Sequence, residues 1–122
     1  MPTNRRNVTS EDLKEEVLAK IKQYQDKGFP EANRIHDLIM EANPNLCPRL
    51  WYGMPGYAKT KDSAVLCFFR KDTLITFGMT ESVNLQSLKV EDDSIIPSAW
   101  YITKLTKDTE QTISRIVKEA TR

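Results

Sequence analysis

The sequence predicts an α+β fold, a two-layer sandwich in which N-terminal helices and a C-terminal helix pack on an antiparallel β-sheet. Two observations support this prediction. Apolar residues recur at helical spacing near both ends of the chain, and the middle contains two apolar runs separated by a short polar turn. The length of 122 residues fits one ordinary core. We therefore expect a single domain over residues 9–122 and a flexible polar arm over residues 1–8.

Two helices are expected before the sheet. Thr9 or Ser10 can cap the first helix, and Gly28 ends it. Its apolar stripe consists of Leu13, Val17, Ile21 and Tyr24. A second helix is expected over residues 31–42, because Asn43-Pro44 follows and stops it.

The middle of the chain is expected to form the sheet. Residues 49–52 form a candidate first strand, which enters a bend over residues 53–56, a Gly-Met-Pro-Gly segment. Residues 63–70 and 73–79 are separated by two polar residues, and this spacing predicts an antiparallel hairpin. Residues 100–102 suggest one more strand.

A last helix is expected to begin at residues 106–109. Asp108 and Gln111 are spaced as a capping pair. Its buried face follows the spacing i, i+3, i+4 and i+7, with Ile113, Ile116, Val117 and Ala120. This helix would close the helical layer over the sheet.

Charge and composition narrow the function classes. Lys and Arg number 18 against 17 Asp and Glu, a net charge of +1, so we expect no nucleic-acid partner. No apolar run approaches the ~20 residues that span a bilayer, and the first residues lack a secretory signal. A cytoplasmic protein without a membrane partner is expected. Cys47 and Cys67 lack C-x-x-C spacing, which favours two free, buried thiols over a disulfide.

Aromatic residues offer one candidate site. They are Trp51, Tyr52, Tyr57, Phe69, Trp100 and Tyr101. Tyr and Trp combine apolar area with a polar tip, so this set could line a ligand groove beside the sheet. The alternative is that most of these side chains are simply core, because a domain of this size must bury several aromatics.

An acidic cluster in the first helix is the candidate metal site. It consists of Glu11, Asp12, Glu15 and Glu16. Residues four apart share a helical face, so the cluster could present pairs of carboxylates to a hard metal ion. The alternative is that these acids only complement the helix dipole. His36 is the single histidine, and no nucleophile–base set is recognisable, so we do not expect an enzyme.

Several residues occur in an order that is typical of a known family. They are Pro44, the Trp51–Pro55 segment, Tyr57, Phe69 and Phe77-Gly78. This order resembles the YdhG-like family, a domain of unknown function, over about residues 17–120. Members of that family often have a histidine in or near the second hairpin strand, whereas residues 70–79 contain none, which weakens a metal role for the sheet.

The resemblance implies a frataxin-type sandwich, and one branch of the family is described as an iron chaperone for iron–sulfur or haem assembly. The leading expectation is therefore a binding protein that holds iron weakly, at the acidic cluster, and meets assembly proteins as partners. The alternative is a small-ligand or protein-interaction module that uses the aromatics around Trp51–Tyr57. A homodimer could cover the exposed edges of the sheet.

Overall fold

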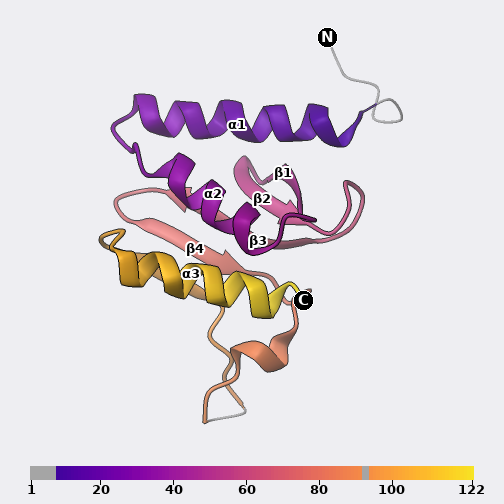
Figure 1. Ribbon diagram of the computed structural model, residues 1–122, viewed down its shortest axis with the longest axis vertical. Coiled ribbons are helices and arrows are strands. Elements are labelled where there is room, and N and C mark those ends of the chain that lie inside the picture. The colour runs from indigo at the N-terminus through magenta and orange to yellow at the C-terminus, as the bar shows by residue number, and fades with distance from the viewer. Residues whose placement is uncertain (1–7, 92–93) are drawn as a thin grey trace.

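One antiparallel β-sheet and a layer of helices make up the molecule (Figure 1). The computed structural model describes residues 8–91 and 94–122. Within them, the helices are α1 (Ser10–Asp26), α2 (Ala32–Ala42), α3 (Lys107–Ala120) and a short 3-10 helix, η2 (Leu85–Leu88). The strands are β1 (Cys47–Trp51), β2 (Met54–Ala58), β3 (Val65–Lys71), β4 (Ile75–Met79) and β5 (Ala99–Ile102). The predicted α+β class is confirmed. Of the expected N-terminal arm, residues 1–7 lie outside the described part.

The strands pair in the order in which they occur in the chain, from β1 to β5, and every neighbouring pair is antiparallel. The predicted hairpin is the β3–β4 pair, in which Phe69 lies opposite Phe77. Such a meander needs only short connections, and the longest one, between β4 and β5, contains η2.

The expected bend over residues 53–56 is wrong, because the chain turns at Tyr52-Gly53 and then forms β2. Trp51 lies opposite Met54, which leaves a two-residue turn. Both turn residues have positive φ, 51° at Tyr52 and 77° at Gly53, as a type I′ hairpin requires. Pro55 fits into β2 because the pairing with β3 begins only at Gly56.

Threonine side chains cap both long helices. The Thr9 hydroxyl accepts a bond of 3.1 Å from the Asp12 amide, and Asp12 Oδ2 accepts one of 3.0 Å from the Thr9 amide. This reciprocal pair is a capping box. At α3 the cap is Thr106, which accepts from the Thr109 amide at 3.2 Å, so the expected Asp108–Gln111 pair is not the cap.

The helices pack on the face of the sheet that holds three large rings, Tyr57, Phe69 and Phe77. These rings are almost fully buried. Each helix contributes its apolar stripe to the same core: Val17 and Ile21 from α1, Ile35 and Ile39 from α2, and Ile113 and Val117 from α3. Burial of each such aliphatic side chain contributes about 1.5–3 kcal/mol, so this interface is the main source of stability.

A hydrogen bond joins two polar groups inside this core. His36 Nδ1 of α2 and the Tyr57 hydroxyl of β2 lie 2.8 Å apart, and both residues are buried. Burial lowers the pKa of the His36 imidazole; Lys14 acts in the same direction, and Asp37 opposes it. Burial also holds the pKa of Tyr57 well above its usual range. The folded state therefore favours a neutral imidazole beside a protonated phenol.

The free energy of unfolding should decrease as the pH is lowered, because His36 is held neutral in the folded state. Its folded-state pKa lies below the unfolded value of about 6.5, so the unfolded chain binds the extra proton first as the pH drops. The stabilisation is complete above that value and is lost as the pH falls toward the lowered one. Urea unfolding between neutral and mildly acidic pH measures this slope.

The control for this measurement is His36→Gln, which keeps a hydrogen-bonding group beside Tyr57 but does not titrate. Because the chain contains one histidine, we expect the slope in this pH window to flatten in the variant. If the variant loses stability as steeply as the wild type when the pH falls, another titrating group causes the effect.

Candidate functional site

The candidate site is the face of the sheet opposite the helices, here called the open face. Figure 1 shows the helical layer lying over one side of the sheet. Side chains alternate along a strand, so the neighbours of the buried rings Tyr57, Phe69 and Phe77 point to the other side. The cross-strand register places these side chains in the outer positions: Arg49, Trp51, Met54, Phe68, Arg70, Thr76, Ala99 and Tyr101. α1 approaches one end of this face, where Met54 and Arg70 line a cleft together with Lys20 and Tyr24.

Phe68 lies at the centre of this face, between two glycines. It pairs with Gly56 on β2 and with Gly78 on β4. A Cβ atom built on Gly78 would lie 2.6 Å from Cζ of Phe68, so the ring lies directly over the Gly78 backbone. Because the two glycines have no side chains, they leave a shallow trough across the sheet, and the Phe68 ring occupies the part of it above Gly78.

Two further aromatics extend this surface toward the β1–β2 turn. The ring centroids of Trp51 and Phe68 are 5.0 Å apart, and those of Trp51 and Tyr52 are 4.8 Å apart in an edge-on arrangement. Tyr52 is 85% exposed. Contacts of this geometry favour a fixed arrangement of the rings. Tyr52, Trp51 and Phe68, together with Tyr101 on β5, form what we call the aromatic patch.

A shallow pocket joins Phe68 to Tyr101. Arg70, Thr76 and Tyr101 are direct cross-strand neighbours on β3, β4 and β5. With Phe68 and Ala99 they line a pocket of about 300 Å³. Tyr101 is 73% exposed, and Arg70 Nε lies 3.0 Å from Asp72 Oδ2 in an exposed ion pair. The open face therefore offers aromatic area, a hydroxyl and a guanidinium side by side.

The aromatic residues singled out in the sequence divide between the two faces of the sheet. Trp51 and Tyr52 lie on the open face, whereas Tyr57 and Phe69 are core residues with centroids 6.5 Å apart. Trp100 faces the helices, where its ring stacks on Phe77 at 5.8 Å. These aromatic residues therefore do not line one common groove. The core interpretation is correct for those on the helix side, and only those on the open face remain candidates for binding.

Sequence reasoning missed Phe68. The signal was present, because Phe68 and Phe69 are adjacent in a strand and must point to opposite faces. Once Phe69 is assigned to the core, Phe68 is assigned to the open face. The glycine partners could not be recognised without the register.

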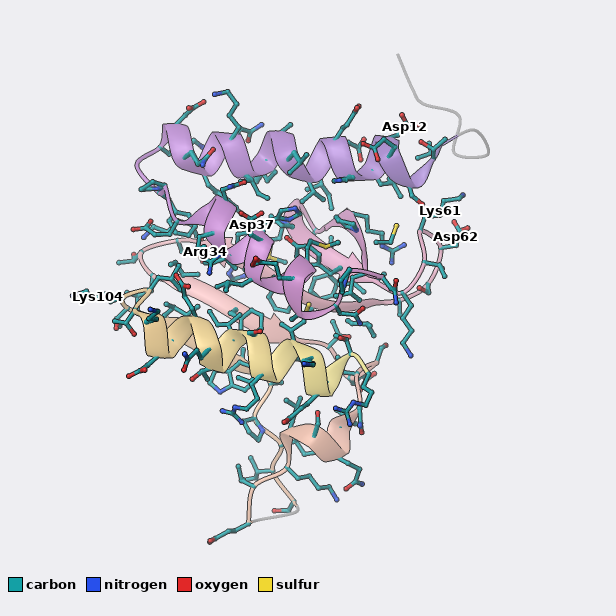
Figure 2. All side chains as sticks on the ribbon, in the orientation of Figure 1. Asp12, Arg34, Asp37, Lys61, Asp62 and Lys104 are labelled. Carbon is teal, nitrogen blue, oxygen red and sulfur yellow. The ribbon has the colours of Figure 1, made fainter. Side chains whose placement is uncertain are left out.

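The acidic cluster is exposed at the start of α1, and Figure 2 shows Asp12 near that end of the helix. The Asp12 carboxylate is engaged in the capping box, and hydrogen bonds from the backbone and side chain of Thr9 lower its pKa. Glu11, Glu15 and Glu16 remain open to solvent. Across residues 8–91 and 94–122, no group of three or more His, Cys, Asp or Glu side chains is arranged to hold a metal ion. A second acidic run in the sequence, over residues 91–93, falls largely outside the described part.

Both thiols are free and buried, as the sequence predicts. Cys67 lies opposite Tyr57, and burial raises its pKa to about 12. A thiol in this state stays protonated at neutral pH and is a poor nucleophile. Cys67 therefore acts as an apolar core residue.

Comparison of the chain with protein-family models, with curated proteins and with solved structures gives no match. Among the helices of the described residues, none combines the length and the apolar character needed to cross a bilayer. The geometry of the open face is thus the main basis for a functional argument.

Gly78→Ala should disturb the centre of the open face. The added methyl group would force the Phe68 ring out of the trough, at a cost of about 1–2 kcal/mol in the free energy of unfolding. Urea unfolding measures this loss. In a Phe68→Ala background the same substitution should cost much less, because the clashing ring is gone. Equal costs in the two backgrounds would contradict the proposed packing.

Proposed function

We propose that this chain is a cytoplasmic protein-interaction module that docks a partner protein on the open face of its sheet. The single observation that supports this proposal best is the aromatic patch, in which the Trp51 ring contacts both Tyr52 and Phe68 on the side of the sheet opposite the buried rings. Large exposed aromatic clusters on monomer surfaces commonly mark interaction sites.

The composition and shape of the surface favour a protein over a small ligand. Trp, Tyr, Phe and Arg are the residue types enriched in protein interfaces and their energetic centres. Small-molecule sites, by contrast, are usually concave and enclose most of the ligand. The pocket beside Tyr101 has a volume of about 300 Å³, and a second cleft of about 460 Å³ lies where Tyr52, Met54 and Arg70 approach α1. The face is thus the surface of a sheet with two hollows. Such a surface suits a broad contact.

Charge points to an acidic partner segment. The two charged residues in outer strand positions are both arginines, Arg49 and Arg70. Arg49 Nη1 donates to the Lys61 carbonyl at 3.0 Å, which fixes the guanidinium beside the patch. Arg70 is held by Asp72 in an exposed pair that a carboxylate of the partner can replace. A segment with Asp or Glu next to apolar residues would complement both parts of this surface.

A peptide selection tests the proposal. A random displayed library is selected on the immobilised protein, and the recovered peptides are titrated in solution. We expect them to be rich in Asp and Glu and to bind at least about tenfold more weakly to Phe68→Ala. The Trp100→Phe variant leaves Trp51 as the single tryptophan, so its fluorescence reports directly on the open face.

Leu18→Ala is the matched control, because Leu18 is an exposed apolar residue on α1, in the helical layer. Its binding should equal that of the wild type. The same titrations with single-stranded oligonucleotides test the competing class of partner. The proposal is refuted if the peptides bind Phe68→Ala and the wild type with equal affinity. It is also refuted if only the oligonucleotides lose affinity when Phe68 or Arg70 is changed to Ala.

A second candidate function is iron handling for iron–sulfur or haem assembly, as the resemblance to the YdhG-like family implies. The supporting observation is that Glu11, Glu15 and Glu16 are exposed at the start of α1, where a hydrated ferrous ion could reach their oxygens. In this proposal iron is a weakly held cargo, and the open face would receive the assembly protein.

Calorimetry with ferrous iron tests this candidate. We expect micromolar binding that weakens when Glu11 and Glu15 are both changed to Gln, because paired carboxylates at i and i+4 are removed while the Asp12 cap is kept. Glu81→Gln, in an exposed turn, is the control and should bind as the wild type does. If the folded wild type gives no heat with iron, this function is excluded.

A further inference from the structure

β5 is the edge of the sheet that remains open. Within the described residues, β5 pairs with β4 on one side and with no strand on the other. Ala99 and Tyr101 are exposed, and Trp100 is half-buried. An unpaired strand edge presents a row of backbone donors and acceptors that another strand can use.

The hydrogen-bonding pattern shows which residues of β5 point outward. The Met79 amide donates to the Ser98 carbonyl at 2.6 Å, so these two residues form a hydrogen-bonded pair. Such pairs alternate along an antiparallel ladder, and Phe77 with Trp100 is therefore the next one. It follows that the N–H and C=O groups of Ala99 and Tyr101 point away from β4, toward the free edge.

A cleft runs beside this edge on the side of the helices. It lies between β5 and α3, has a volume of about 330 Å³, and is lined in part by Phe77, Trp100, Thr112, Ile113 and Ile116. Lys104, which Figure 2 shows near the start of α3, also lines this cleft. An added strand would bring apolar side chains to the cleft and hydrogen bonds to the edge.

The opposite edge of the sheet is protected by contrast. β1 contains Pro48, which offers no N–H, and Arg49. α1 packs along β1. Proline, charge and a covering helix are the usual means of blocking a strand edge. β5 has none of them, since residues 95–103 include no charged side chain and their one proline, Pro97, precedes the strand.

We propose that β5 pairs with β5 of a second copy of this chain, in an antiparallel dimer whose two-fold axis passes through Tyr101. The outward groups of the two Tyr101 residues then exchange two backbone hydrogen bonds. A two-fold axis perpendicular to the sheet keeps each side chain on its own face, so Trp100 lies opposite Ile102 of the other copy, beside the cleft. Ala99 lies opposite the other Thr103.

The sequence of the edge favours a second copy as the occupant. The inward residues Trp100 and Ile102 are both apolar; Ile102 is already buried, so the half-buried Trp100 supplies most of the apolar area that one copy can add beside the cleft of the other. Pairing through Trp100 instead would force two indoles into directly opposed positions. The uncharged stretch adds no like-charge repulsion to self-pairing. The four-residue strand buries less than the standard interface of roughly 1,600 Å², so the dimer is weak and depends on concentration.

The dimer goes beyond the proposed docking function, with which it shares Tyr101, and would place two open faces on the same side of a ten-stranded sheet. Sedimentation from low micromolar to millimolar concentration tests it. We expect Tyr101→Lys and Tyr101→Glu each to weaken the dimer about tenfold or more, and an equimolar mixture of the two to restore it, because the two positions face each other across the axis. Tyr52→Lys, at an even more exposed tyrosine away from the edge, should dimerise as the wild type does.

Amide hydrogen exchange gives a second readout. The amides of Ala99 and Tyr101 should exchange more slowly as the protein concentration rises, whereas that of Trp100, already bonded to β4, should not change. If the wild type stays monomeric at millimolar concentration, the proposal is wrong, and a strand of another protein becomes the alternative partner for this edge. A dimer without protection at Tyr101, or one that the mixed variants do not restore, overturns it as well.

Discussion

The two-residue turn at Tyr52-Gly53 determines which side chains of the sheet face the helices. Side chains alternate with a period of two, so a shift of one residue at this turn would exchange the two faces of β2 relative to β1. With the observed turn, Trp51 lies outward and Tyr57 inward. Tyr57 then reaches His36 of α2, and its cross-strand partner Cys67 points to the same face of the sheet from β3. The core and the open face are both consequences of this register.

The two faces use aromatic residues in different ways. Inside, Tyr57, Phe69 and Phe77 fill the space under the helices, and the Tyr57 hydroxyl satisfies the one buried imidazole. Outside, the Phe68 ring lies over Gly78, which offers no side chain to obstruct it. Glycine in the interior of a strand weakens the sheet. At Gly78 its presence is explained by the close approach of the Phe68 ring, and at Gly56 by the Arg49 carbonyl oxygen and Trp51 Cβ, each 3.0 Å from where a Cβ atom would lie.

Much of the fold could be predicted from the sequence, because apolar spacing identifies helices and hairpins locally. Such spacing predicts the three α-helices and the β3–β4 hairpin, whereas the free thiols follow from the absence of C-x-x-C spacing. β2 was missed because Gly and Pro in Met54–Ala58 disfavour a strand, and only the pairing with β1 and β3 overrides that preference. The aromatic site could be predicted only in part. Residue types indicate that a ring is large and polar at its tip, but the face on which it lies depends on the register between strands.

The strand order has a consequence for how the chain acquires its structure. Because β1 to β5 pair in sequence, most backbone contacts of the sheet join residues that are close along the chain, a topology associated with rapid folding. Long-range contacts outside the sheet include those that join α2 to α3 and to Thr121, the residue that ends α3. Arg34 bonds Glu110 at 2.8 Å across 76 positions, and Asn43 bonds Thr121 at 3.0 Å across 78. During synthesis the meander could therefore form as it leaves the ribosome, while Ile35 and Ile39 stay partly uncovered until the last fourteen-residue helix emerges.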